Sequence, residues 1–134
     1  MKPFIKMLFP VMALVLFCSL SASAEMVPCA QCGMGADLGS KFTSRIVQPK
    51  QTQHFCDIGD LFAYLKANPA AASDAQVKDF KTGAWINAQQ AFYVNSAKKF
   101  QTPMGWGIAA FKNKPETAEF GDALDFNGMM KSLK

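Results

Sequence analysis

Residues 57–68 read DIGDLFAYLKAN and give the clearest structural signal of the chain. Leu61, Phe62 and Leu65 recur at helical spacing and would form one apolar face. Asp57 is suited to cap the first turn, because its carboxylate can accept hydrogen bonds from the free backbone N–H groups there. A proline follows the stretch and cannot continue a helix. The stretch therefore predicts a helix that packs one face against a core.

Strands are expected on both sides of this helix. Residues 42–47 alternate between apolar and polar side chains, and residues 51–56 follow as a hairpin partner. The next strand is expected at residues 77–81, after a linker at residues 70–74. Residues 25–40 are rich in glycine and small residues and show no period, so a loop is expected there.

The second half of the chain runs through a similar order of elements. Strands are expected at residues 91–95, 107–111 and 123–126, a short helix at residues 115–121, and a terminal turn at residues 129–133. Strand, strand, helix and strand therefore occur twice. This order predicts an α+β fold of two related ββαβ units, residues 25–82 and 83–134, packed as one small domain.

Residues 1–24 have the layout of a secretory signal peptide. Lys2 and Lys6 precede an apolar run of roughly ten residues, shorter than the ~20 that cross a membrane, and small residues end the segment. Export would place residues 25–134 in the periplasm. A lipid anchor on Cys18 is not expected, because Phe17 stands where such signals need a small residue.

Charge and composition argue against several classes of function. The formal charge of +4 falls to +2 when Lys2 and Lys6 are removed, which is too weak and scattered to predict nucleic-acid binding. A single histidine excludes a multi-histidine catalytic centre. No glycine-rich phosphate loop is present, and no small-molecule substrate is expected. We therefore predict a protein without enzymatic turnover.

The cysteines give the first indication of function. Cys29, Cys32 and Cys56 remain beyond the signal, an odd number that leaves at least one thiol unpaired in an oxidising compartment. Residues 29–34 read CAQCGM, so two thiols and the thioether of Met34 can approach one ion. Thiolate and thioether ligands together select Cu(I) over hard cations. A structural disulfide or a zinc knuckle is the alternative interpretation of this motif.

Two further segments offer ligands. His54 and Cys56 lie two apart on a predicted strand and would face the same side. With Cys29 and Cys32 they would make a Cys3His zinc site, the structural alternative to copper, although Cys56 could equally be a small buried core residue. Met104 lies between proline and glycine in a predicted loop, where its sulfur could reach an incoming ion.

A thiol-disulfide oxidoreductase is the enzymatic alternative, with Cys29 and Cys32 as its reactive pair. Such enzymes normally place the first cysteine at the N-terminus of a helix, which lowers its pKa. Here Gly33, Gly35 and Gly39 follow the pair, and they disfavour a helix at this point.

The motifs taken together resemble the NosL family, the accessory copper chaperones of nitrous oxide reductase maturation. Four motifs in order carry the resemblance: CxxCGM at residues 29–34, HFCD at 54–57, WINA leading to AFYV at 85–94, and TPMG at 102–105. It implies a Cu(I) site at Cys29, Cys32, Met34 and Met104, with Cys56 and His54 as neighbours. It also implies delivery of copper to a periplasmic enzyme such as nitrous oxide reductase, or to a membrane copper-transfer complex.

Overall fold

The computed structural model describes residues 25–134, and its central element is the predicted helix, α1 (Ile58–Ala67). Asp57 is the N-cap, and its side chain accepts a hydrogen bond from the backbone N–H of Gly59. Leu61 and Leu65 on the apolar face are fully buried. The helix agrees with the prediction to within one residue at each end.

A four-stranded antiparallel sheet packs against α1, with its strands in the order β4-β3-β5-β6. The strands are β3 (Ser44–Val47), β4 (Thr52–Phe55), β5 (Ala75–Lys78) and β6 (Trp85–Asn87). The 3-10 helix η1 (Pro69–Asp74) connects α1 to β5, where the sequence predicted a linker. The first half therefore has the expected order of two strands, a helix and a strand.

The strand expected at residues 77–81 lies two to three residues earlier in the structure. Asp79 leaves the sheet and forms a parallel bridge with Ala110, and the backbone N–H of Phe80 donates to the Ala110 carbonyl at 2.8 Å. This change of partner ends β5 at Lys78. A contact to a residue thirty positions later cannot be predicted from the local sequence pattern.

Residues 25–40 form a β-hairpin, so the prediction of a loop without strands was wrong. The strands are β1 (Met26–Pro28) and β2 (Gly35–Asp37), paired antiparallel. Each has three residues, too few to show the alternation by which a strand is recognised. The hairpin lies beside β4, because Cys29 forms a parallel bridge with His54.

The second half begins with the predicted antiparallel pair, β7 (Phe92–Asn95) and β8 (Ile108–Phe111). The short helix expected next is the 3-10 helix η2 (Lys114–Thr117). The strand expected at residues 123–126 is reduced to a bridge between Leu124 and Tyr93.

The helix α2 (Phe126–Ser132) occupies the segment where only a terminal turn was expected. Asp125 caps it and accepts a hydrogen bond from the backbone N–H of Gly128, so the chain turns into a helix directly after Leu124. The cap explains why the last strand is so short.

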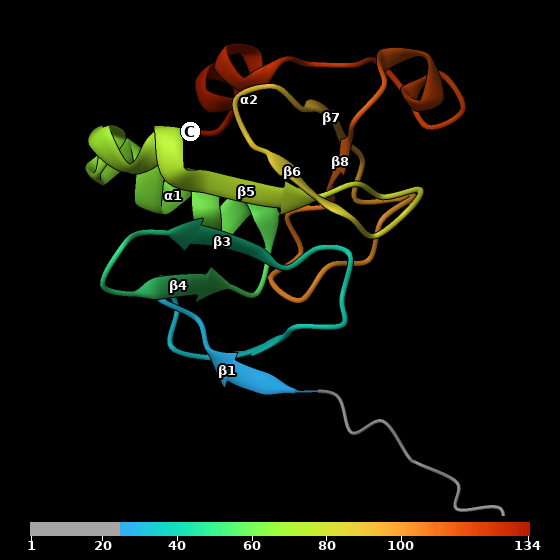
Figure 1. Cartoon of the computed structure of the whole chain (residues 1–134). Coiled ribbons are helices and arrows are strands. Elements are labelled where there is room, and N and C mark those ends of the chain that lie inside the picture. Colours follow the sequence, from blue (N-terminus) through green and yellow to red (C-terminus); the bar gives the residue numbers. More distant parts are fainter. Residues whose placement is uncertain (1–24) are drawn as a thin grey trace, which may run out of the picture.

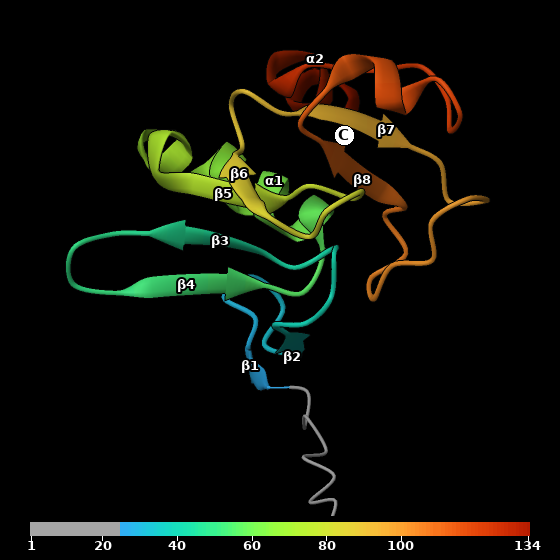
Figure 2. The same ribbon diagram turned by 45° about the vertical axis from the view of Figure 1, so that its right-hand side comes forward.

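Figures 1 and 2 show α1 lying between the four-stranded sheet and β8, and α1 contacts β3, β4 and β8. The main core contains the fully buried side chains of Phe55, Tyr93 and Met129 together with Phe62 of the helix itself. A second cluster, dominated by Phe100 and Phe111, lies against Phe42, Phe80 and Phe120.

The mixture of sheets and helices confirms the predicted α+β class. The division at residues 82 and 83 stays a prediction, and β6 beyond it pairs with β5 before it.

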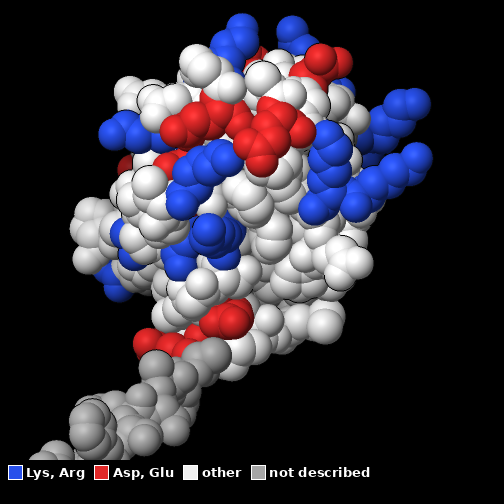
Figure 3. Space-filling model, turned by 90° about the vertical axis from the view of Figure 1, so that its right-hand side faces the viewer, with Lys and Arg blue, Asp and Glu red and all other residues white. Residues whose placement is uncertain are grey.

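Charges of both signs are interspersed on the face drawn in Figure 3, and Lys81 and Glu119 form an ion pair of 3.2 Å. This face therefore presents no extended field of one sign. Within residues 25–134, none of the helices has the length and apolar character needed to cross a membrane. The predicted signal peptide, including Cys18, lies outside the described residues.

Candidate metal centre

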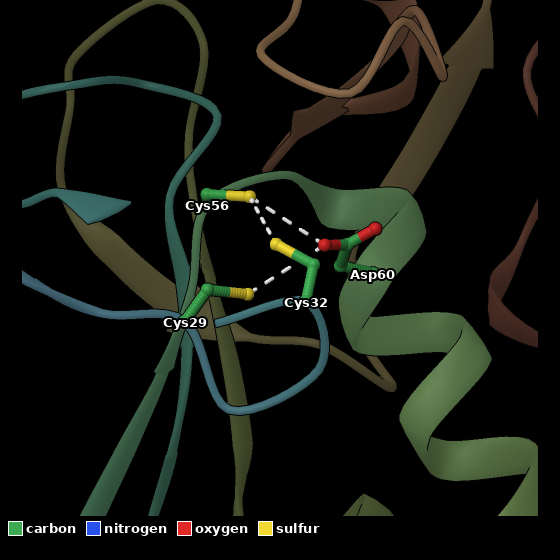
Figure 4. Close-up of side chains that lie close together, drawn as sticks. All are labelled: Cys29, Cys32, Cys56 and Asp60. Atoms are coloured by element: carbon green, nitrogen blue, oxygen red, sulfur yellow. Dashed lines mark hydrogen bonds between the residues drawn. The ribbon is translucent and has the colours of Figure 1, made fainter. Parts of the chain in front are cut away.

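Three cysteine thiols and one carboxylate converge beside the N-terminus of α1. The sulfur atoms of Cys29, Cys32 and Cys56 and a carboxylate oxygen of Asp60 all lie within 4.8 Å of one another (Figure 4). Cys29 and Cys32 come from the turn between β1 and β2, Cys56 follows β4, and Asp60 belongs to the first turn of α1. The fold thus brings together the three cysteines that the sequence singled out.

The turn that carries Cys29 and Cys32 is held by backbone hydrogen bonds. The N–H of Cys29 donates to the Met34 carbonyl at 2.7 Å, and the N–H of Gly33 donates to the Cys29 carbonyl at 2.9 Å. Gly33 has φ 76°, in the left-handed region that glycine adopts without strain. The N–H of Ala30 also donates to the His54 carbonyl at 2.8 Å, which fixes the turn against β4.

The carboxylate of Asp60 organises two of the thiols. The sulfur atoms of Cys29 and Cys56 each lie 3.5 Å from Asp60 Oδ2 and donate to it. The sulfur of Cys32 lies 3.5 Å from the sulfur of Cys56. Cys29 and Cys56 are 3% and 1% exposed, whereas Cys32 is half-buried. The group is therefore closed on the core side and accessible at Cys32.

Asp60 is the site residue that sequence reasoning missed. It is almost fully buried, and the indole Nε1 of Trp106 donates to its other oxygen at 2.9 Å. A buried carboxylate needs such donors, because burial without partners is costly. The available signal was its place four residues after Cys56, in the first turn of the predicted helix.

Asp57 joins the second half of the chain to this site. One oxygen accepts the N-cap bond from Gly59, and the other accepts from Thr102 Oγ1 at 2.5 Å and from the Met104 N–H at 3.0 Å. The Thr102 hydroxyl oxygen in turn accepts from the Gly107 N–H at 3.0 Å. The predicted loop of Met104 is thereby attached to the residue that follows Cys56.

Both predicted thioether ligands are exposed. Met34 is 56% and Met104 is 41% exposed, which is unusual for large apolar side chains. Met34 lies in the backbone-bonded turn of the cysteines, and Met104 lies at the loop held by Asp57. Their role as ligands stays a prediction.

His54 lies next to the cluster in the backbone but is not one of its four members. It is a half-buried residue of β4, opposite Arg45 on β3 and bridged to Cys29. Burial, with the nearby Arg45 charge, lowers the pKa of the imidazole. The structure places Asp60 where the sequence argument expected this histidine as the fourth group. A role for His54 in metal binding stays a prediction.

Burial raises the pKa of two of the thiols, Cys56 and Cys32, and so favours their protonated form. It is the largest cause that raises the pKa of Cys56 above its ordinary value of 9.0, and hydrogen bonds with Cys32 and Cys29 act in the same direction. Burial also raises the pKa of Cys32. A metal ion that binds the thiolates must therefore displace their protons.

This shift predicts a loss of stability in alkali. Above pH 9 the unfolded chain releases the Cys56 proton while the folded, metal-free chain retains it, so the free energy of unfolding falls by up to about 1.4 kcal/mol per pH unit. Urea unfolding of the reduced protein at pH 8 and pH 10 measures the loss. Cys56→Ala is expected to lose less between these pH values, and an equal loss in both proteins would contradict the assignment.

Similarity to known proteins extends over most of the chain. The model of the NosL family matches residues 21–131 of the chain. The fold is similar to the crystal structure of the copper chaperone NosL from Shewanella denitrificans, with a TM-score of 0.59 and 22% identity over 75% of this chain and 87% of that one. No curated protein matches the chain. Because the family model covers most of its length, the chain belongs to the NosL family.

Proposed function

We propose that this protein is a Cu(I) chaperone that binds the ion through its cysteine cluster and passes it to another protein without catalytic turnover. The observation that carries the proposal is the convergence of three thiol sulfurs within 4.8 Å. Soft sulfur ligands favour Cu(I) over the hard cations that oxygen ligands prefer. The crystal structure with the similar fold is that of a copper chaperone.

The accessibility of the cluster supports transfer rather than permanent storage. Cys29 and Cys56 are buried, whereas Cys32 is half-buried and Met34 and Met104 are exposed. A ligand of a partner protein can approach from that side and replace the outer ligands one at a time. We propose as recipient a maturing copper enzyme such as nitrous oxide reductase, or a membrane copper-transfer complex, and the periplasm as the compartment.

Zinc is the second candidate ion, and Asp60 is the observation that favours it. Three thiolates and a carboxylate are accepted zinc ligands in a tetrahedral site. Such a site would be closed and would stabilise the fold outright. Elemental analysis after native purification separates the two proposals. Stoichiometric zinc, with unfolding on chelation, would favour the structural site over copper transfer.

A thiol-disulfide oxidoreductase has less support from the geometry. Cys29 and Cys32 lie in a turn between two strands, and neither belongs to the first turn of a helix, where such enzymes place the reactive cysteine. Burial instead raises the pKa of Cys32, which reduces the thiolate needed for turnover. An insulin-reduction assay is expected to give no activity above background.

The central experiment is a titration of the reduced protein with Cu(I) in the presence of a chromophoric competing chelator. We expect the protein to take the ion from the chelator, and Cys32→Ser and Cys56→Ser to lose this ability because each removes a thiolate. Met34→Leu and Met104→Leu test the thioethers. Met130→Leu, in α2 and half-buried, is the matched control and should leave affinity unchanged.

Two further measurements complete the test. Far-UV circular dichroism of each variant shows whether the fold persists, so that lost affinity is not lost structure. A copper K-edge spectrum of the loaded protein counts sulfur neighbours, and we expect mainly sulfur. Copper uptake by the double variant Cys29→Ser/Cys32→Ser equal to that of the unmodified protein would reject the proposal.

A further inference from the structure

Of the three thiols in the cluster, Cys32 and Cys56 are in direct sulfur–sulfur contact. Their sulfur atoms lie 3.5 Å apart, while the sulfur of Cys29 makes its hydrogen bond to Asp60 Oδ2, which also accepts from Cys56 (Figure 4). We propose that oxidation joins Cys32 to Cys56, across 24 residues of sequence, and not to its neighbour Cys29 in the CxxC motif. The linkage stands independently of metal, and only its consequence for copper rests on the proposed function.

The geometry around the two partners permits the bond. A disulfide holds its sulfur atoms about 2.05 Å apart, so the two atoms must approach by about 1.5 Å. Cys32 lies in the half-exposed part of the turn, and a Cβ added at the following Gly33 would meet no atom within 4 Å. The turn is therefore not packed against other atoms at Gly33, directly after Cys32.

Cys29 is more constrained than Cys32. Its N–H and carbonyl are both bonded within the turn, and its backbone forms the bridge to β4. Its sulfur donates to the Asp60 carboxylate, and Figure 4 shows it approaching that carboxylate from the side opposite α1. A bond between Cys29 and Cys32 would remove the Cys29 hydrogen bond to Asp60, and a bond between Cys32 and Cys56 would remove that of Cys56, so either linkage leaves one thiol donor on the carboxylate. The preference for Cys56 therefore rests on its 3.5 Å sulfur contact with Cys32 and on the fixed backbone of Cys29.

The greater exposure of Cys32 makes it the first of the two cysteines to react. The half-buried Cys32 thiolate attacks an external disulfide, RSSR, forms a mixed disulfide and releases one thiolate, RS⁻. The Cys56 thiolate then attacks the Cys32 sulfur and releases the second RS⁻. The two cysteines lose two protons and two electrons, and the external disulfide gains them as two RSH molecules. Cys56 is buried, so the external disulfide reaches Cys32 first and Cys56 reacts only with the mixed disulfide.

The bond and the metal exclude each other. Oxidation removes two of the three thiolates that the proposed function requires, and leaves Cys29 with Asp60 as the remaining pair. Copper bound to the thiolates likewise makes them unavailable to an oxidant. The proposed chaperone would therefore accept Cu(I) only while this pair is reduced.

Peptide mapping tests the linkage without metal. The metal-free protein is treated with oxidised glutathione, free thiols are alkylated, and the protein is cleaved with trypsin. Trypsin leaves Cys29 and Cys32 in one peptide, because no lysine or arginine lies between them and the next cleavage site is Lys41. Cys56 lies in a separate peptide, residues 51–66. We expect the two peptides to be joined, with alkylated Cys29. Cys29→Ser is the matched control and should give the same joined peptides.

Three results would overturn the inference: a bond within the first peptide between Cys29 and Cys32, a bond between Cys29 and Cys56, or a stable glutathione adduct without a protein disulfide. The effect of the disulfide on copper binding is measured in a separate experiment. The oxidised protein should lose Cu(I) to the competing chelator, and preloading with Cu(I) should prevent the peptides from joining. If the reduced protein takes up no Cu(I) while the peptides still join, the proposed function fails and the linkage stands.

Discussion

Replacing Gly59 with alanine is expected to destabilise the protein by about 2–3 kcal/mol, although alanine favours a helix over glycine by about 1 kcal/mol. Gly59 lies in the first turn of α1, beneath the indole of Trp106. A Cβ added there would lie 2.0 Å from Trp106 Cγ and within 2.4 Å of two more ring atoms. The ring must move away, and its hydrogen bond to Asp60 is then lost.

A double-mutant cycle measures this effect. Urea unfolding gives the free energy of unfolding for the unmodified protein, Gly59→Ala, Trp106→Ala and the double variant. Trp106→Ala removes the ring, so the alanine at position 59 then has space and only its helix preference remains. We expect Gly59→Ala to be neutral or stabilising in that background. A loss of equal size in both backgrounds would show that contact with the indole is not the cause.

Asp57→Ala is expected to lower the free energy of unfolding by about 2–4 kcal/mol, because one side chain serves three donors. The substitution removes the N-cap of α1 and leaves the Thr102 hydroxyl and the Met104 N–H without their acceptor. Asp57 is fully buried, so water does not replace the lost bonds directly. The loop of Met104 should also separate from the helix.

Hydrogen exchange distinguishes the loop from the whole fold. We expect the Met104 amide to exchange faster in Asp57→Ala by a larger factor than the amides of α1, since it loses its own acceptor. Asp57→Asn is the conservative control, because it retains one oxygen for the cap and should destabilise less. Unchanged protection of Met104 in Asp57→Ala would contradict the role assigned to this carboxylate.

The sequence predicted correctly the helix and the strand pairs whose signals lie within their own residues. The helix at residues 57–68 carried its own cap, apolar face and terminator, and the structure reproduces it closely. The hairpin of β3 and β4 and the pair of β7 and β8 also appear where alternation indicated them. Each of these segments is long enough for its period to be visible.

The errors lie where distant residues decide the structure or where a strand is too short to show its period. β5 ends at Lys78 because the chain there turns to Ala110, and the N-terminal hairpin forms from strands of three residues. Asp60 was overlooked because an acidic residue in the first turn of a helix is ordinarily a solvent-exposed partner of the helix dipole. Its burial depends on Trp106, which is 46 residues away in sequence.

The bonds of Asp57 and Asp60 to the loop at residues 102–107 also bear on the order of events during synthesis. All three thiols are present once the first half of the chain has been made, but the carboxylate among them acquires its indole partner only when that loop arrives. Contacts of such sequence separation form late in folding. A nascent chain would therefore carry every sulfur atom before it has a finished binding pocket, and ion capture would follow completion of the polypeptide.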